Sequence, residues 1–266
     1  MRSGQHASGP PADGPMLAGL AEQAPADFGV RVLRMAGIPR EVYDVYVRLD
    51  TAAGGLFVAS GQEAVTGTAL DAGELDATAF EELHRGRTGR SALPTARPFP
   101  GVVPALRTGR ARRLRIDLSP LDPVDQDVLE AVRAIPAGQL RPIGWIAREA
   151  GAAPDEVLVG LAHNPATVLI PGHRAVYDDG TPCDLAHPPG AAEALRAAEG
   201  VDMRRVAELR RRGAVFLGSD TTRIYCHPTC AHARRITRPH QVPFRTAREA
   251  GRAGYRACKS CRPVTV

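Results

Sequence analysis

The middle of the chain carries the clearest helical pattern. After Pro120, apolar residues recur at spacings of three or four, which predicts an amphipathic helix: Val128, Leu129, Val132 and Ile135. Two shorter helices are expected in IGWIAREAG (143–151) and PDEVLVGLAHN (154–164), with a glycine ending the first and a proline near the start of the second. Such a pair is typical of a helix-turn-helix whose later helix reads DNA, although many helix pairs bind nothing.

The pattern before these helices is different. Between 42 and 70, apolar and polar residues alternate, which predicts antiparallel hairpins with turns at Gly54-Gly55 and Gly61-Gln62. Residues 1–27 are rich in Gly, Pro, Ala and Ser, so we expect a disordered tail. The basic segment 107–115 is interpreted equally well as a solvated linker or as a DNA contact.

The length of 266 residues exceeds one typical domain of roughly 100–200 residues. We expect an α/β N-terminal domain (28–116), a helical, winged-helix-like domain with a helix-turn-helix (117–201), a linker helix (202–213) and a small α+β module (214–266). The composition, 44% apolar and 24% charged, excludes disorder of the whole chain. No apolar run approaches the roughly 18 residues of a membrane span, and no secretory leader is recognisable. A soluble cytoplasmic protein is therefore expected, associated with the bacterial nucleoid if it binds DNA.

Charge is concentrated at the C-terminal end. From Ala214 onward, the chain has nine arginines and Lys259 but only two acidic residues, Asp220 and Glu249. The net charge of this segment is therefore +8. The remaining 24 basic and 27 acidic residues give −3, so the net charge of +5 hides a strongly basic module. Such a module is suited to binding the phosphates of DNA, although a solvated basic surface would have the same composition.

The same module holds four of the five cysteines. Cys226 and Cys230 form a C-x3-C pair, and after 27 residues Cys258 and Cys261 form a C-x2-C pair. Two thiolates from each of two tight turns can complete a tetrahedral site, for which zinc is the expected metal and an iron–sulfur cluster the alternative. Disulfides would need an oxidising compartment, and the lack of a recognisable secretory leader argues against one.

The text around these cysteines resembles the Ada metal-binding module of bacterial alkylation-repair proteins. The segments TTRIYCHPTC (221–230), AREAGRAGY (247–255) and CKSCRP (258–263) carry the resemblance, which covers the last fifty residues. It implies that Cys226 accepts a methyl group from a methylphosphotriester in DNA, with the other three cysteines as supporting zinc ligands. It also implies that Thr222, Arg234 and Arg235 lie near the backbone phosphate.

A second resemblance covers the helices. AIPAGQLRPIGWIAREAG, VGLAHNP, VLIPGHRAVYDDG and AAEG follow the order of the C-terminal domain of O6-alkylguanine-DNA alkyltransferases. The N-terminal part more weakly resembles the small α/β domain that precedes it. The family has a Pro-Cys-His-Arg motif, and here Gly172 takes the place of the acceptor cysteine. The residues that would activate that cysteine are present: Asn164, His173 and Glu199.

Two further positions depart from the family. Its tyrosine is expected where Ile143 stands, and its DNA-propping arginine is assigned to Val157. Cys183 is a weak candidate for a substitute nucleophile. The resemblance therefore implies a degenerate domain similar to alkyltransferase-like proteins, which bind alkylated bases without a cysteine.

The leading interpretation is a monomeric DNA repair and response protein that acts on alkylated duplex DNA. Cys226 would take one methyl group per protein without turnover, and the site at Gly172 would be inactive. The alternative is a non-catalytic sensor or transcriptional regulator with a structural zinc. A third possibility is a decayed protein without function.

Overall fold

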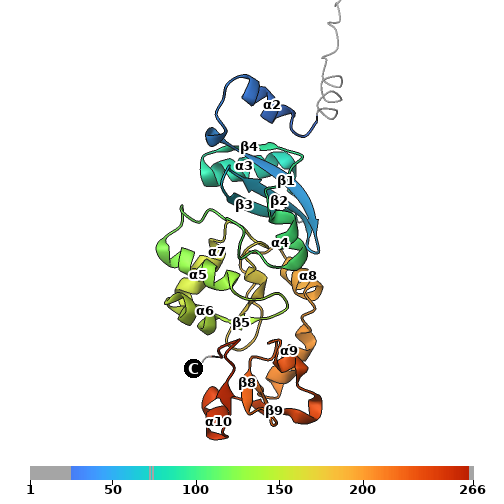
Figure 1. Ribbon diagram of the computed structural model, residues 1–266, viewed down its shortest axis with the longest axis vertical. Coiled ribbons are helices and arrows are strands. Elements are labelled where there is room, and N and C mark those ends of the chain that lie inside the picture. Colours follow the sequence, from blue (N-terminus) through green and yellow to red (C-terminus); the bar gives the residue numbers. More distant parts are fainter. Residues whose placement is uncertain (1–24, 72, 74, 264–266) are drawn as a thin grey trace, which may run out of the picture.

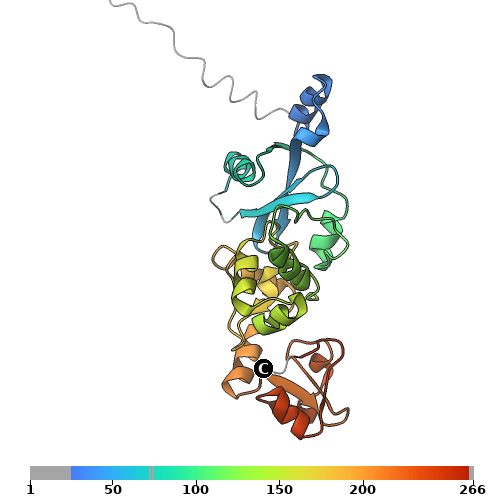
Figure 2. The same cartoon turned by 90° about the vertical axis from the view of Figure 1, so that its left-hand side faces the viewer.

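The computed structural model describes residues 25–71, 73 and 75–263. Figures 1 and 2 show three parts in a row along the long axis: a sheet with helices, a helical middle and a small module at the opposite end. This arrangement confirms the expected fold class of an α/β part, a helical part and a small α+β module. The predicted tail lies almost entirely outside the described residues. No helix in the described part is long and apolar enough to cross a membrane.

The N-terminal part is built on a four-stranded sheet of order β3-β2-β1-β4. Its strands are β1 (Tyr43–Thr51), β2 (Gly54–Ser60), β3 (Val65–Asp71) and β4 (Ser91–Pro94), and its helices are α2 (Phe28–Met35), α3 (Ala77–Thr88) and α4 (Val102–Thr108). The first three strands form the expected hairpins, and β4 adds to β1 in parallel. The first turn falls at residues 52–53, two positions before the prediction, because Gly54 already pairs with Thr51.

The two faces of this sheet belong to two separate cores. Tyr46 and Phe57 face α3, where Phe57 stacks on Phe80 with ring centroids 4.8 Å apart. Val47 points to the opposite face, as alternation along a strand requires, and joins the large core of the middle part. The sheet is therefore covered on both sides.

The middle part consists of four helices, the first three of which pack on one another, and two short strands. Its elements are α5 (Pro123–Arg133), β5 (Arg141–Pro142), α6 (Ile143–Ala150), α7 (Pro154–Ala162), β6 (Ala175–Val176) and α8 (Ala191–Ala198). The three predicted helices are present, and Gly151 ends α6 in a left-handed conformation. The first helix begins at Pro123 and not at Pro120, because Pro120 lies in a separate turn that the Leu121 amide closes on the Leu118 carbonyl at 3.0 Å. Pro123 suits the first turn of the helix, where its missing N–H is not needed.

The boundary expected at 116/117 lies inside one continuous core. Val47, Leu56 and Val65 of the sheet share that core with Val128 and Leu129 of α5. The segment 107–115 is not a free linker, because Ala111 and Leu114 are buried in this core. Its backbone is also tied to the sheet, with the Arg115 carbonyl accepting a hydrogen bond from the Val65 amide at 2.9 Å.

The C-terminal module has a four-stranded sheet of order β10-β8-β7-β9. The elements are α9 (Met203–Arg211), β7 (Phe216–Ser219), β8 (Ile224–Cys226), β9 (Gln241–Phe244), α10 (Ala247–Arg252) and β10 (Arg256–Ala257). A small aromatic core holds the sheet to α10. The predicted linker helix is α9, and it is packed on both sides: Val206 joins a cluster of the middle part, and Leu209 joins Leu217 of β7.

Candidate functional site

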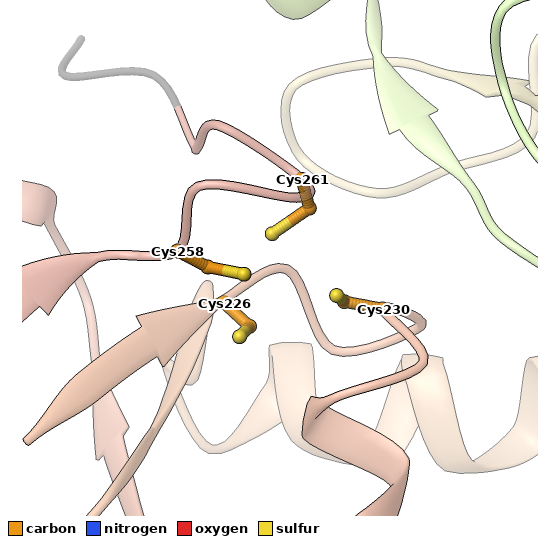
Figure 3. A group of neighbouring side chains, drawn as sticks. All are labelled: Cys226, Cys230, Cys258 and Cys261. Atoms are coloured by element: carbon orange, nitrogen blue, oxygen red, sulfur yellow. The ribbon is translucent and has the colours of Figure 1, made fainter. Parts of the chain in front are cut away.

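The sheet of the C-terminal module brings the two cysteine pairs together. Strands β8 and β10 are parallel neighbours, with Ala257 opposite Tyr225. One residue further along each strand, Cys226 and Cys258 therefore leave the sheet side by side. Each is followed by a tight turn that carries the second cysteine of its pair; the Cys230 amide closes one turn on the His227 carbonyl at 3.0 Å. Figure 3 shows the four side chains converging from these two turns.

The four sulfurs fit a zinc ion. All of them lie within 4.8 Å of one another and all four residues are buried, with Cys230 and Cys261 fully so. Four thiolates from two tight turns are the donor set of structural zinc sites. The cysteine cluster is a zinc site, as the spacing predicted.

A hollow of about 490 Å³ opens beside this centre, and of the four ligands only Cys226 lines it. Its wall also holds Thr222, His232 and Arg235. The Nδ1 atom of His232 lies 3.4 Å from the Cys258 sulfur. The hollow therefore reaches one cysteine of the centre, Cys226, next to a hydroxyl and a guanidinium.

The two candidate arginines point to different places. Arg235 lines the hollow with Thr222. Arg234 lies away from it, with its guanidinium beside Gly138 of the middle part, where a Cβ would come within 3.3 Å of Nη1. Of the two, only Arg235 is placed to meet a group bound at Cys226.

The turn between β7 and β8 positions Thr222. The Ser219 hydroxyl lies 2.8 Å from that of Thr221 and accepts a hydrogen bond from the Thr222 amide at 3.3 Å. The next residue, Arg223, has a φ of 52°, a left-handed conformation that closes the turn. These bonds hold the threonine pair at the rim of the hollow.

The second candidate site surrounds Gly172, in the short helical turn of residues 172–174. A Cβ at this position would lie 3.2 Å from Cε1 of His187 and 3.8 Å from Nδ2 of Asn164. The His187 ring thus crowds the space into which an acceptor side chain would project. The sequence analysis missed His187, which belongs to no motif and reaches the site only through the folding of loop 177–190.

His173 and His187 form a buried pair beside this glycine. Their rings meet edge to face at 5.8 Å. Within the described residues, both ring nitrogens of His187 and the Nδ1 atom of His173 have no hydrogen-bond partner. Burial lowers the pKa of His187 to about 4 and also lowers the pKa of His173. His187 is therefore neutral near pH 7.

Glu199 is the hub of a polar network. It pairs with Nε2 of His173 at 3.0 Å and accepts several hydrogen bonds from the Arg174 guanidinium and one from the Gly138 amide at 2.8 Å. Burial raises the pKa of Glu199, but the bonds from His173 and Arg174 outweigh it and hold that pKa at about 2. The carboxylate is ionised, and it fixes the turn that carries Gly172.

Asn164 and Cys183 lie in positions that suit structural roles and not catalytic ones. The Asn164 amide donates to the Ile170 carbonyl at 3.0 Å and its oxygen accepts from the Ala166 amide at 3.0 Å, which closes the loop after α7. Cys183 lies in the main core at 2% exposure. Burial raises the pKa of its thiol, so little of it is in the nucleophilic thiolate form.

The assignment of Val157 to a DNA-facing position is wrong. Val157 is fully buried in the main core, so its side chain points away from the surface that a recognition helix would offer to DNA. Ile143 is also buried there. The exposed residues at the start of α7 include Asp155 and Glu156, and α7 carries no arginine or lysine. An acidic helix end repels phosphate.

Two protein families match this chain, one over the middle part and one over the C-terminal module. Residues 123–201 match the family described as "6-O-methylguanine DNA methyltransferase, DNA binding domain". Residues 205–264 match the family described as "Metal binding domain of Ada". The chain thus joins an alkyltransferase-type domain to an Ada-type zinc domain, in that order.

Individual relatives cover parts of the chain. A "DNA base-flipping protein" from Thermus thermophilus is 34% identical over 67 residues, which are 25% of this chain and 46% of that protein. The chain thus spans about half the length of this curated relative. Among solved structures, the Mycobacterium tuberculosis O6-methylguanine methyltransferase shares 26% identity at a TM-score of 0.44, over 59% of this chain and 92% of that one. The O6-methylguanine-DNA methyltransferase of Pyrococcus kodakaraensis shares 19% identity at a TM-score of 0.45, over 59% of this chain and 99% of that one.

Removing the zinc should unfold the C-terminal module alone. The aromatic core of this module is small, and metal binding contributes on the order of 10 kcal/mol to folding in modules of this kind. We expect a strong chelator, or the substitution Cys258→Ala, to make residues 214–263 sensitive to protease while 43–201 stays resistant. Cys183→Ala, which removes a buried thiol outside the site, is the control. A chelated protein whose C-terminal module remained resistant would contradict this.

Proposed function

We propose that this protein repairs alkylated DNA, with Cys226 as the acceptor of a methyl group from methylphosphotriesters. The position of Cys226 carries the proposal, because it is the one zinc ligand on the wall of the hollow beside the centre. Its surroundings suit the substrate: Arg235 can pair with phosphate oxygens, and the Thr222 hydroxyl can donate to them. The basic balance of the module would draw in the DNA backbone.

The transfer is a displacement at carbon. The Cys226 sulfur supplies an electron pair to the methyl carbon, and the bond from that carbon to the phosphotriester oxygen breaks. The oxygen leaves with the bonding pair, which restores an ordinary phosphodiester anion. Bound zinc would keep the cysteine sulfurs deprotonated at neutral pH, the form in which sulfur is nucleophilic. Arg235 would stabilise the charge that returns to the phosphate.

The product is a thioether, which no residue of the centre can demethylate. Each protein molecule therefore acts once, and the reaction is stoichiometric. A hydroxyl and a guanidinium at the mouth of the hollow would hold the phosphotriester so that its methyl carbon faces sulfur. The chain thus supplies binding and orientation, and its own sulfur is consumed.

The middle domain, we propose, transfers no alkyl group from bases. Gly172 offers no sulfur where the related family has its acceptor, and Cys183 is buried with a raised thiol pKa. The acidic start of α7 argues against tight DNA binding by this helix alone. DNA binding would then depend mainly on the zinc module.

Incubation with DNA containing methylphosphotriesters should add one methyl group to Cys226. Intact-protein mass spectrometry followed by peptide mapping would locate it. Arg235→Gln should slow the transfer by on the order of 10- to 100-fold, the loss expected for one charge-assisted contact. Arg234→Gln is the matched control and should change the rate little. Unmodified protein that still binds the DNA would favour the alternative of a sensor with a structural zinc.

Restoring a thiol at position 172 should not by itself restore base repair. In Gly172→Cys the new Cβ meets the His187 ring at 3.2 Å, and crowding of this kind costs about 1–3 kcal/mol. We expect the double substitution Gly172→Cys with His187→Ala to take methyl from O6-methylguanine DNA faster than Gly172→Cys alone. His187→Ala alone should take none. Equal rates for the single and double variants would contradict the role given to His187, and methyl on Cys183 of the unaltered protein would contradict its inertness.

A further inference from the structure

The zinc module is docked on the middle domain through both of its cysteine turns. Thr229, between Cys226 and Cys230, accepts a hydrogen bond from the Leu140 amide at 2.8 Å through its hydroxyl. The indole of Trp145, in α6, donates to the Cys261 carbonyl at 2.9 Å. The helix that follows β5 thus holds the backbone of the metal centre itself.

Arg141 is buried at the heart of this contact. It is 1% exposed, and its guanidinium lies 5.3 Å from the centroid of the Trp145 ring. Its Nη atoms donate to the Leu140 carbonyl and the Gln139 side chain at 2.8 and 2.7 Å, and both acceptors are neutral. Within the described residues, no carboxylate forms a salt bridge with Arg141, and its Nε atom has no partner.

A buried guanidinium without a carboxylate needs another negative charge, because an uncompensated ion in the interior is costly. The cysteine centre is the negative group beside it. Burial lowers the pKa of Arg141, whereas the four sulfurs raise it, Cys261 most of all. Four thiolates around a divalent zinc ion leave an excess of two negative charges. The centre can therefore balance Arg141 as a carboxylate would.

We propose that Arg141 is the counter-cation of the zinc–thiolate centre, and that methylation of Cys226 releases the zinc module from the middle domain by weakening this pairing. The trigger rests on the proposed function, whereas the pairing does not. A methylated sulfur carries no charge, so the centre keeps one excess negative charge of its two. The attraction to Arg141 falls accordingly, while the cost of burying the guanidinium is unchanged.

Release would serve the response to damage. The docked module presents the hollow at Cys226 but holds Arg234 against Gly138 of the middle domain. An undocked module would free this arginine and the surface around Thr229 for the DNA backbone. The same methyl group that records the repair would then change how the two domains are joined.

Trp145 allows a direct test, because it is the only tryptophan of the chain and is 4% exposed at the interface. The measurements are acrylamide quenching of its fluorescence and hydrogen exchange of the Leu140 amide, both on full-length zinc-loaded protein. The samples are unmodified protein and protein methylated on Cys226 by methylphosphotriester DNA or by methyl iodide. Zinc content and circular dichroism are checked for each sample.

Loss of one charge opposite a buried cation should raise the ratio of released to docked protein, and with it Leu140 exchange, on the order of ten-fold. Arg141→Met should be released before any methylation and should not respond to it, whereas Arg141→Lys should stay closer to the unmodified protein. Thr229→Val, which loses a hydrogen bond but no charge, should still respond to methylation.

Two results would overturn the proposal: methylated, zinc-containing protein with unchanged quenching and exchange, or Arg141→Met as well protected as the unmodified protein. Failure of the DNA to methylate Cys226 would count against the proposed function alone. Methylation by methyl iodide would then still test the pairing with Arg141.

Discussion

The four cysteine sulfurs repel one another, and both the metal and the buried arginine beside them offset that repulsion. Sulfurs gathered within 4.8 Å of one another in a buried site cannot all be ionised without a cation among them. A zinc ion supplies that cation, but its two positive charges leave two of the four thiolate charges unbalanced. That excess would have three effects here: it makes sulfur nucleophilic, it repels the phosphates of DNA, and it stabilises a buried arginine of the neighbouring domain.

The distribution of charge along the chain fits a division of labour. The zinc module has the basic sequence and the one cysteine ligand that lines a hollow, whereas the helix in the place of a recognition helix begins with Asp155 and Glu156. In the middle domain, Glu199 pairs with Arg174 and His173 in a largely buried network beside Gly172. We infer that the middle domain acts as a platform for the zinc module, held through Arg141 and Trp145.

The sequence predicted features that depend on local patterns. The cysteine spacing predicted the zinc site, and the apolar periodicity predicted α5, α6 and α7, since both are set by residues close together in the chain. Features that depend on tertiary packing were not accessible. Val157 directly follows Glu156 at the exposed start of α7, and only the fold shows that its side chain points into the core. His187 lies fifteen residues after Gly172, and no motif indicates that its ring turns back onto that glycine.

The charge of the zinc–thiolate centre should show itself directly in the affinity of the protein for DNA. Duplex DNA affinity should be measured against salt concentration for protein with and without a methyl group on Cys226, both with zinc bound. Binding should be about ten-fold tighter for the methylated protein near ~0.15 M salt, with a difference that shrinks as salt rises and does not depend on base sequence. Equal affinities at low salt would contradict this expectation.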